Sequence, residues 1–552
     1  MLRNPCRLLV GLWLAAGLAG CGGGSASATP ASFNPPAGST PTPAQRTDVV
    51  TYKNDLARSG QNLTESVLTL ANVNASSFGL LRILSVDGKV DAQPLYLSAL
   101  SLGGAAHNVV FVATENDSVY AFDADSGSTL WHVSLLGSGE TVSDPRGCNQ
   151  IAPVIGVTST PVIDRAAGPH GAIFAVAMSS GGAYHQRLHA LDVTTGAELF
   201  GGPREITASY AAPAGGGTRS FDPGQYAERA ALLLSQGTLY TSWTSHCDQA
   251  PYTGWVIAYN ETTLAQTAVL NVAPNGTGSG AASAGPAIWM SGGGPAADTA
   301  GNVYLLTANG AFETTLDANG FPSGGDYGNS FLKLGPSGTS ALAVIDYFTM
   351  YDEVSESAAD EDLGSGGVLL LPDLTDAGGS VRHLMVGAGK DGNLYVVNRD
   401  SLGKFSSTAN NIWQQLSGVL PGGIWSTPAW FNGMLYYGPS GASLRAFPAS
   451  GARLAATPSS QSAATFAYPG TAPAISANGT ANAIVWAHEN ASLAVLHAFD
   501  AINLARELYN SSQAPNGRDQ FGAGNKFITP TIADGKVFVG TQSGVAVFGL
   551  LN

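Results

Sequence analysis

A short phrase recurs along this chain and limits its fold more than any other feature. Residues 119–131 read VYAFDADSGSTLW, which is an alternating strand, an Asp, a Ser-Gly turn and then Leu-Trp; residues 188–200 (LHALDVTTGAELF) repeat it closely. In such a phrase Asp123 can accept hydrogen bonds from backbone N–H groups, and Gly127 can adopt a positive φ. Trp131 can pack against a neighbouring sheet. The phrase therefore predicts repeated β-hairpins that pack against one another. Weaker copies lie at residues 255–266, 393–404, 443–454 and 496–509.

A second series of segments lies upstream of these copies and is rich in small residues, often with a Pro. Its members begin near Ala92, Thr158, Glu228, Gly292, Gly364, Trp425, Gly470 and Phe527. Together the two series predict about eight four-stranded units, and a radial ring of such sheets is a β-propeller. Small residues fit the ring centre, where the sheets converge.

The last predicted unit, residues 536–551, has only part of a four-stranded sheet. We expect residues 78–88 (FGLLRILSVDG) to complete this eighth sheet, because closing the ring removes two open sheet edges. The predicted fold class is therefore all-β: an eight-bladed β-propeller of four-stranded antiparallel blades, closed by an N-terminal strand.

The composition agrees with many short strands and tight turns. The chain of 552 residues holds 70 Gly and 30 Pro, and only 11% of its residues are charged. Its net charge of −15 makes it a poor binder of phosphate backbones, so no nucleic-acid partner is expected. We expect a monomer.

The recurring phrase also carries a family resemblance. Ala121, Asp123, Ser126, Gly127, Leu130 and Trp131 resemble the tryptophan-docking repeat of the pyrroloquinoline-quinone (PQQ) dehydrogenases. The resemblance implies an eight-bladed propeller and, for an enzyme of that family, PQQ beside a Ca²⁺ with an Asp base. The chain departs from the family's alcohol dehydrogenases, because it has no adjacent Cys pair and no C-x-x-C-H haem motif. The family's Glu/Asn/Asp calcium set cannot be placed on this sequence.

The N-terminal region has the features of an export signal. Arg3 and Arg7 precede an apolar run, residues 8–20, that is too short to span a membrane as a mature helix. The ending Leu-Ala-Gly-Cys resembles a bacterial lipobox, in which Cys21 would be lipidated; an ordinary signal with an incidental Cys is the alternative. The domains expected are a signal peptide (1–20), a Gly/Ser/Pro tether (21–46) and the propeller (47–552). Gly22 after the Cys implies an outer-membrane lipoprotein of the bacterial cell envelope, facing the periplasm or the exterior.

Two cysteines remain outside the predicted signal, Cys148 and Cys247. In an oxidising exported compartment they are expected to form a disulfide if they are neighbours in space. Propeller topology would place both in loops on one face, which makes the bond feasible. Two unpaired buried thiols are the alternative.

The loops expected on that face form the candidate ligand surface, because long irregular loops on a rigid scaffold commonly carry function. The candidate residues are Glu115, Asn116, Asp117, His246, Asp248, Trp289, Lys390, Asp391, Trp425 and His488. Each has a plainer alternative: Trp289 and Trp425 could stack on a quinone or a sugar or only pack, and Lys390-Asp391 could be a tight turn. His246 beside Asp248 could be an oriented base, but no nucleophile has a matching spacing.

Two acidic stretches suggest a metal only weakly. Residues 360–362 and 317–320 offer oxygen ligands suited to Ca²⁺, yet neither follows the EF-hand spacing, and solvated acidic loops are the favoured interpretation. Catalytic and metal-binding residues therefore stay unassigned.

Two functions from different classes remain. The tether and the lack of clear catalytic residues favour a lipid-anchored binding or scaffold module for a protein or glycan at the cell envelope. Propeller lipoproteins of the outer-membrane assembly machinery are of this class. The alternative is a periplasmic PQQ- and Ca²⁺-dependent dehydrogenase, and hydrolase or lyase chemistry is supported by no residue pattern.

Overall fold

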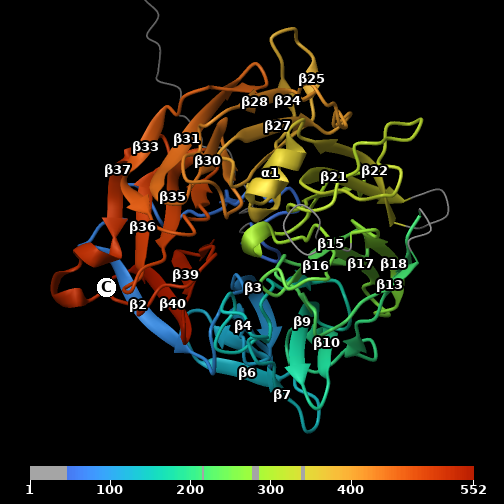
Figure 1. The fold of residues 1–552 in the computed structure, drawn as a ribbon. Coiled ribbons are helices and arrows are strands. Elements are labelled where there is room, and N and C mark those ends of the chain that lie inside the picture. The colour runs from blue at the N-terminus through green and yellow to red at the C-terminus, as the bar shows by residue number, and fades with distance from the viewer. Residues whose placement is uncertain (1–46, 214–216, 277–284, 337–341, 552) are drawn as a thin grey trace, which may run out of the picture. The chain divides into compact units, whose positions relative to one another are not determined.

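The computed structural model describes residues 47–213, 217–276, 285–336 and 342–551. The predicted signal peptide (1–20), Cys21 and the tether lie outside these residues. The described chain forms a ring of eight blades, each a twisted and mostly antiparallel sheet (Figure 1). None of its helices has the length and hydropathy that a bilayer span requires.

The first four blades follow one another along the chain. Blade 1 contains β3 (Leu95–Leu102), β4 (Ala105–Ala113), β5 (Ser118–Asp123) and β6 (Thr129–Ser134). Blade 2 contains β7 (Thr141–Val142), β8 (Val162–Asp164), β9 (Ala172–Ser180), β10 (Tyr184–Asp192) and β11 (Arg204–Glu205). Blade 3 contains β14 (Tyr226–Ala227), β15 (Leu233–Ser235), β16 (Thr238–Ser245), β17 (Trp255–Asn260) and β18 (Gln266–Asn271). Blade 4 contains β19 (Ala296–Ala297), β20 (Val303–Leu306), β21 (Ser330–Pro336) and β22 (Leu342–Thr349).

The remaining blades continue this order. Blade 5 contains β23 (Leu369–Leu370), β26 (Leu384–Ala388), β27 (Leu394–Asn398) and β28 (Gln414–Leu416). Blade 6 contains β29 (Ala429–Phe431), β30 (Met434–Tyr437), β31 (Ala442–Ser450), β32 (Arg453–Leu454) and β33 (Ser460–Phe466). Blade 7 contains β34 (Ala474–Asn478), β35 (Ala481–Glu489), β36 (Val495–Asp500), β37 (Asn503–Asn510) and the short parallel strand β1 (Gln61–Asn62). Blade 8 contains β38 (Thr531–Ala533), β39 (Lys536–Gly540), β40 (Gly544–Leu550) and β2 (Phe78–Ser85).

Short elements lie in the loops between and within the blades. They are the hairpins β12 (Ser209–Ala211) with β13 (Thr218–Ser220) and β24 (Leu374–Thr375) with β25 (Val381–Arg382), the helix α1 (Glu353–Ala359), and the 3₁₀ turns η1 (Met290–Gly292), η2 (Leu363–Ser365), η3 (Ser511–Gln513) and η4 (Pro515–Gly517).

Blade 8 joins the two ends of the described chain. Its strand β2 pairs antiparallel with β40 from Phe78 opposite Leu550 to Ser85 opposite Gly544. The other three strands come from the C-terminal end of the chain. The first strand, β1, takes no part in this sheet and pairs with β34 of blade 7.

The recurring phrase has the local structure that its residues predict. Asp123 Oδ1 accepts hydrogen bonds from the backbone N–H of Ser126 at 2.7 Å and of Asp125 at 3.1 Å. Gly127 has a φ of +79°. Trp131 Nε1 donates to the carbonyl oxygen of Val193 at 3.0 Å, which ties blade 1 to blade 2. The phrase therefore forms a turn and an inter-blade contact, and it builds the ring.

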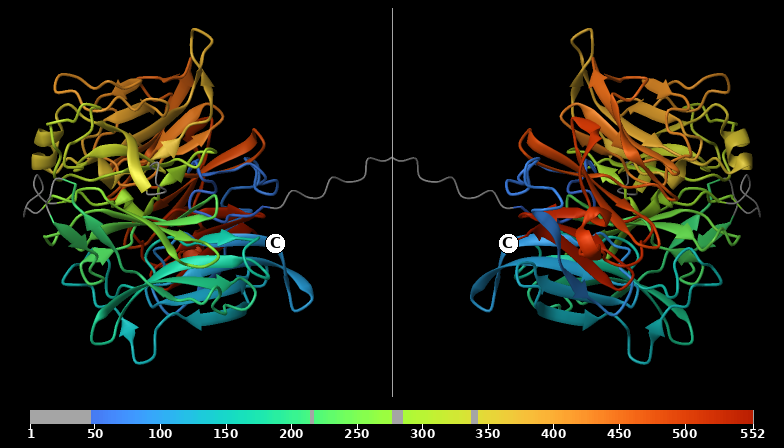
Figure 2. Two further views of the ribbon diagram at one scale, coloured as in Figure 1. Left: turned by 90° about the vertical axis from the view of Figure 1, so that its right-hand side faces the viewer. Right: turned by 90° about the vertical axis from the view of Figure 1, so that its left-hand side faces the viewer.

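An N-terminal segment, residues 49–60, closes the ring centre on one side; we call it the plug. Its backbone carbonyls accept hydrogen bonds from the inner strands of blades 2, 4, 5, 6 and 7. Val50, Leu56, Ala57, Ser59 and Gly60 accept from Ile163, Ala297, Leu370, Trp430 and Ile475 respectively. In Figure 2 this first segment lies on the side of the ring opposite α1. Within the described ranges, the plug therefore covers the ring centre on the side away from α1.

Two fully buried basic side chains fasten the plug. Lys53 Nζ donates to the carbonyl oxygens of Pro428, at 3.1 Å, and of Pro473. Arg58 Nε donates to the carbonyl oxygen of Pro295 at 2.8 Å, and its Nη2 donates to that of Leu232 at 3.2 Å. The Pro residues of the small-residue series thus present carbonyls toward the axis, and the plug supplies the donors that these buried carbonyls need.

Candidate functional site

A pocket lies at the centre of the ring, in line with the plug and open on the α1 side. Its cavity volume is about 90 Å³. Its lining residues are Gln150, Arg229, Asp248, Trp289, Ser291, Asn309, Asp360, Asp362, Ser365, Lys390, Trp425, Tyr468, Lys526 and Phe527. Most of them directly precede an inner strand or lie in a loop between blades, so blades 2 to 8 all contribute to one site.

Arg229 gives the pocket an unpaired positive charge. Its side chain is only 6% exposed, and it donates no hydrogen bond to any residue that the structure describes. The guanidinium carbon lies 4.6 Å from the ring centre of Phe527. Burial lowers the pKa of Arg229, and the Asp91 carboxylate opposes this change. An arginine remains charged despite such a shift, so a buried guanidinium with free donors is suited to bind a carboxylate or another anion.

Aromatic side chains form much of the remaining wall. Trp425 and Tyr468 meet edge to face with ring centres 5.4 Å apart, and Tyr468 meets Phe527 in the same manner at 6.5 Å. Trp289 contributes a further ring from the loop before blade 4. These rings offer flat apolar surfaces beside the polar groups of Gln150, Asn309 and the serines.

The acidic side of the pocket carries its own cation. Lys390 Nζ lies 2.8 Å from Asp360 Oδ1 and 2.8 Å from Asp362 Oδ1. Asn309 Nδ2 also donates to Asp360 Oδ1, at 2.8 Å. The two carboxylates raise the pKa of Lys390 well above its ordinary value, although burial acts in the opposite direction. The carboxylates of Asp360 and Asp362 thus share one ammonium.

A buried polar network supports the Arg229 side of the pocket. Asp91 forms an ion pair with Lys89 at 2.9 Å and accepts a hydrogen bond from Asn525 Nδ2 at 2.6 Å. Burial, and next the nearby Asp91 carboxylate, raise the pKa of Glu115 well above its usual range. Its Oε2 accepts hydrogen bonds from the Gly156 N–H at 2.8 Å and from the Thr158 hydroxyl at 2.9 Å.

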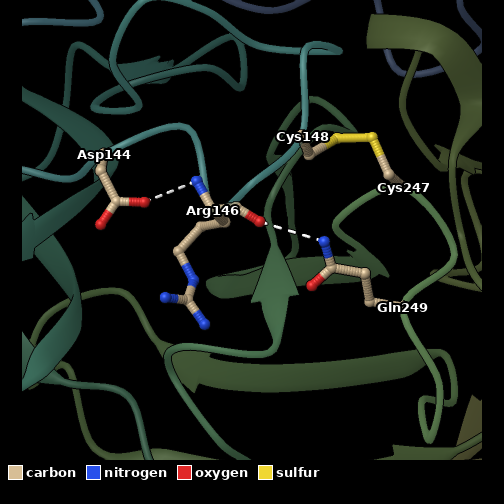
Figure 3. Close-up of a disulfide and its surroundings, with 5 residues drawn as sticks. All are labelled: Asp144, Arg146, Cys148, Cys247 and Gln249. Carbon is tan, nitrogen blue, oxygen red and sulfur yellow. Dashed lines mark hydrogen bonds between the residues drawn. A yellow bond between two sulfur atoms is a disulfide. The ribbon is translucent and has the colours of Figure 1, made fainter.

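Cys148 and Cys247 form the disulfide that the sequence predicts, with their Cα atoms 5.7 Å apart (Figure 3). The bond joins the loop that follows β7 to the β16–β17 loop. Gln249 Nε2 adds a hydrogen bond to the carbonyl oxygen of Arg146 at 3.1 Å. Since Gln150 and Asp248 line the pocket beside the two cysteines, the disulfide holds one wall of the site.

The structure brings four of the ten predicted ligand-face residues into this pocket: Asp248, Trp289, Lys390 and Trp425. His488 lines a smaller adjoining hollow together with Trp425 and Phe527. His488 is 3% exposed, its Nε2 has no hydrogen-bond partner in the described chain, and burial lowers its pKa to about 4.

The other five predicted residues have structural contacts away from the pocket. Glu115 belongs to the buried network above, and Asn116 donates to the carbonyl oxygen of Asp87 at 2.5 Å. Asp117 is buried in the β4–β5 turn. Asp391 accepts hydrogen bonds from the Tyr395 hydroxyl at 2.6 Å and the Asn393 N–H at 3.2 Å, as a tight turn does. His246 Nε2 lies 3.2 Å from the carbonyl oxygen of Tyr226, and burial lowers the pKa of His246 to about 4.

Sequence reasoning missed the two unpaired cations of the pocket, Arg229 and Lys526. Both are adjacent to, or within, segments of the small-residue series, at Glu228 and Phe527. A charge at the inner end of an otherwise small and apolar strand is the signal that could have identified them. Tyr468 and Phe527 carried no comparable signal, because aromatic residues are frequent throughout the blades.

The donor set does not fit Ca²⁺. A divalent cation of this kind needs six to eight oxygen ligands, whereas the ammonium of Lys390 already lies between Asp360 and Asp362. Elsewhere in the described ranges, no group of three or more His, Cys, Asp or Glu side chains is placed to hold a metal ion. The 317–320 stretch is a turn, in which Asp317 Oδ1 accepts hydrogen bonds from the backbone N–H of Asn319 at 2.8 Å and of Phe321 at 2.9 Å.

Three solved structures with a similar fold are alcohol or methanol dehydrogenases. The quinohemoprotein alcohol dehydrogenase of Comamonas testosteroni superposes with a TM-score of 0.60 and 15% identity, over 92% of this chain and 81% of that one. A quinohemoprotein alcohol dehydrogenase of Pseudomonas putida HK5 gives 0.58 and 12%, over 91% and 80%. A europium-containing methanol dehydrogenase gives 0.55 and 13%, over 91% and 98%.

Sequence comparison adds no closer relative, since the chain matches no protein-family model and no curated protein resembles it in sequence. At these identities the structural likeness concerns the fold and leaves the chemistry of the pocket open. The chain therefore has the eight-bladed, PQQ-like β-propeller fold that the quinoprotein alcohol and methanol dehydrogenases share.

Proposed function

We propose that this protein is a binding module whose central pocket takes an acidic glycan, recognised through a carboxylate. The observation that carries the proposal is Arg229, a residue that is only 6% exposed, lines the pocket and makes no side-chain hydrogen bond within the described chain. Burying a cation of this kind costs desolvation free energy unless an anion pairs with it. A ligand carboxylate would supply that anion through charge-assisted hydrogen bonds.

The remaining lining favours a sugar ring over other carboxylates. Trp289, Trp425 and Phe527 supply flat apolar faces, and the side chains of Gln150, Ser291, Asn309 and Ser365 supply polar groups of the kind that hydroxyl-rich ligands require. With a cavity volume of about 90 Å³, the pocket is far too small for a folded protein partner, so we propose a small ligand such as a single sugar unit.

The binding module is proposed to act at the bacterial cell envelope, attached through a lipid on Cys21. Outer-membrane attachment and the periplasmic or exterior orientation are parts of this proposal.

A pair of matched sugars tests the ligand class. D-galacturonate and D-galactose differ in a carboxylate, and saturation-transfer NMR with the intact protein measures both at weak affinity. We expect D-galacturonate to bind at least about tenfold more tightly than D-galactose, which is the size of one charge-assisted hydrogen-bond contribution. The variant Arg229→Met should remove this preference, whereas Arg506→Met at the surface ion pair with Asp500 should retain it.

Two results would contradict the proposal. Equal binding of the charged and neutral sugar would show that Arg229 does not select an anion. Stoichiometric uptake of PQQ with Ca²⁺, followed by dye reduction with an alcohol substrate, would instead support the dehydrogenase that the fold likeness suggests.

A further inference from the structure

Lys526 differs from every other lysine of this chain. The sequence contains seven lysines, all within the described ranges. Three of the others donate to backbone carbonyls: Lys53 to Pro428 and Pro473, Lys333 to Arg399, and Lys404 to Asn319. Three more form ion pairs: Lys89 with Asp91, Lys390 with Asp360 and Asp362, and Lys536 with Asp125. Among the described residues, the ammonium of Lys526 has no such partner.

The surroundings of Lys526 disfavour its charged form. The side chain is partly buried and lines the central pocket beside Phe527. Burial lowers the pKa of Lys526, and the positive charges of Arg229 and Lys89 lower it further, while Asp91 acts in the opposite direction. A lysine that is partly desolvated, lies near other cations and lacks a carboxylate partner has more neutral amine than a surface lysine at the same pH.

A neutral amine in a ligand pocket is a nucleophile toward carbonyl carbon. The same pocket holds Arg229, whose free donors suit a carboxylate. A ligand with both a carboxylate and an aldehyde or ketone could therefore engage both side chains at once. Acidic sugars with a free reducing end and 2-oxo acids belong to this chemical class.

We propose that Lys526 forms a reversible imine with the carbonyl group of a carboxylate ligand that Arg229 holds in the pocket. The neutral Nζ adds to the carbonyl carbon, forming a C–N bond while the C=O electron pair moves to oxygen, and the oxygen takes up the proton that the attached nitrogen releases. Loss of water from this carbinolamine gives the imine, and hydrolysis returns the free amine and carbonyl. This inference rests on the proposed function, because it requires the carboxylate site at Arg229, and it names the class of ligand captured there.

Reductive trapping tests the imine directly. The intact protein is incubated with glyoxylate, which has an aldehyde and a carboxylate, in the presence of sodium cyanoborohydride as hydride donor. Intact mass spectrometry counts the adducts, and peptide mapping locates them among the seven lysines and the N-terminal amine. We expect one predominant adduct, on Lys526, and competition by glycolate, which has the carboxylate but no carbonyl.

Matched variants separate the roles of the two cations. Lys526→Arg keeps the positive charge and should abolish the adduct, whereas Lys404→Arg should leave it unchanged. Arg229→Met should slow trapping of glyoxylate by about tenfold, while trapping of propionaldehyde, which has no carboxylate, should change little. The circular dichroism and thermal midpoint of each variant show whether it has folded.

The outcomes distinguish this inference from the proposed function. Adducts spread over several lysines, or none on Lys526 while D-galacturonate still binds, would overturn the imine and leave the acidic-glycan proposal intact. An adduct on Lys526 that Arg229→Met does not slow would overturn the role of Arg229 in holding the ligand. Failure of all carboxylates to bind or compete would overturn both proposals.

Discussion

Arg229 and Phe527 form a cation–π pair across the central pocket, with the guanidinium carbon 4.6 Å from the ring centre. Arg229 extends from the segment before β15 in blade 3, and Phe527 from the segment before β38 in blade 8, so the contact joins distant blades. Since the ring has no lone-pair acceptor and takes up no N–H···O bond, the N–H donors of the guanidinium stay available to a ligand. The pair therefore orients a group that we propose to bind carboxylates.

Replacement of the ring should weaken anion binding without removing the charge. Phe527→Leu loses a contact worth about 0.5–2 kcal/mol, so we expect the Kd for D-galacturonate to rise by roughly twofold to thirtyfold. The matched control is Phe321→Leu, which removes a similar pair outside the pocket, where Lys404 Nζ lies 4.3 Å from the ring centre. NMR titration measures both. Equal affinity of the two variants would contradict an orienting role for Phe527.

Lys53 of the plug should contribute strongly to stability. Lys53→Met leaves the buried carbonyls of Pro428 and Pro473 without their donor, at a cost of about 1–3 kcal/mol for each unsatisfied group. We expect a lower urea midpoint, measured by tryptophan fluorescence. Lys536→Met, which removes an ion pair with the half-exposed Asp125, should change the free energy of unfolding by less than about 1 kcal/mol. A midpoint for Lys53→Met equal to that of Lys536→Met would show that the plug is not fastened through Lys53.

The architecture could be predicted because its determinants are local and repeated. The Asp123 turn and the Trp131 wedge depend on residues within one phrase and on a neighbouring copy of it. The inner strands follow the Pro residues of the second series: β19 starts after Pro295, β29 after Pro428 and β38 after Pro530.

The plug and most of the pocket could not be predicted in this way. Lys53 and Pro473 are 420 positions apart in the chain, and no local pattern indicates that a lysine before the first blade donates to carbonyls of the sixth and seventh. Arg229, Tyr468 and Lys526 converge for the same reason, since the closed ring brings together loops that the sequence separates. Trp289 and Trp425 could be predicted as pocket residues because large aromatic side chains stand out in the loops that were expected on the candidate ligand surface.

Loss of the disulfide should affect both stability and ligand binding. Cys148 and Cys247 are separated by 99 positions, and a loop of that size corresponds to about 4–5 kcal/mol in the chain-entropy model. We expect the double variant Cys148→Ser/Cys247→Ser to unfold at a lower temperature in calorimetry. Because Gln150 and Asp248 line the pocket beside these cysteines, its affinity for D-galacturonate should also fall. Unchanged affinity in the folded double variant would show that the wall holds its shape without the bond.

His488 should make the protein sensitive to acid. Burial lowers the pKa of His488 from 6.5 to about 4, so the folded protein holds this side chain neutral while the unfolded chain protonates it near pH 6.5. The group therefore contributes stability that is fully present above pH 6.5 and is lost as the pH falls toward 4, by a total on the order of 3 kcal/mol.

His488→Gln removes this titration, so its free energy of unfolding should approach or exceed that of the unmodified protein as the pH falls. Urea unfolding at several pH values measures this difference, and His246→Gln should give the same sign, because burial also lowers the pKa of His246 to about 4. A difference between His488→Gln and the unmodified protein that stays constant from pH 7 to pH 4 would mean that His488 is protonated as easily in the folded state as in the unfolded chain.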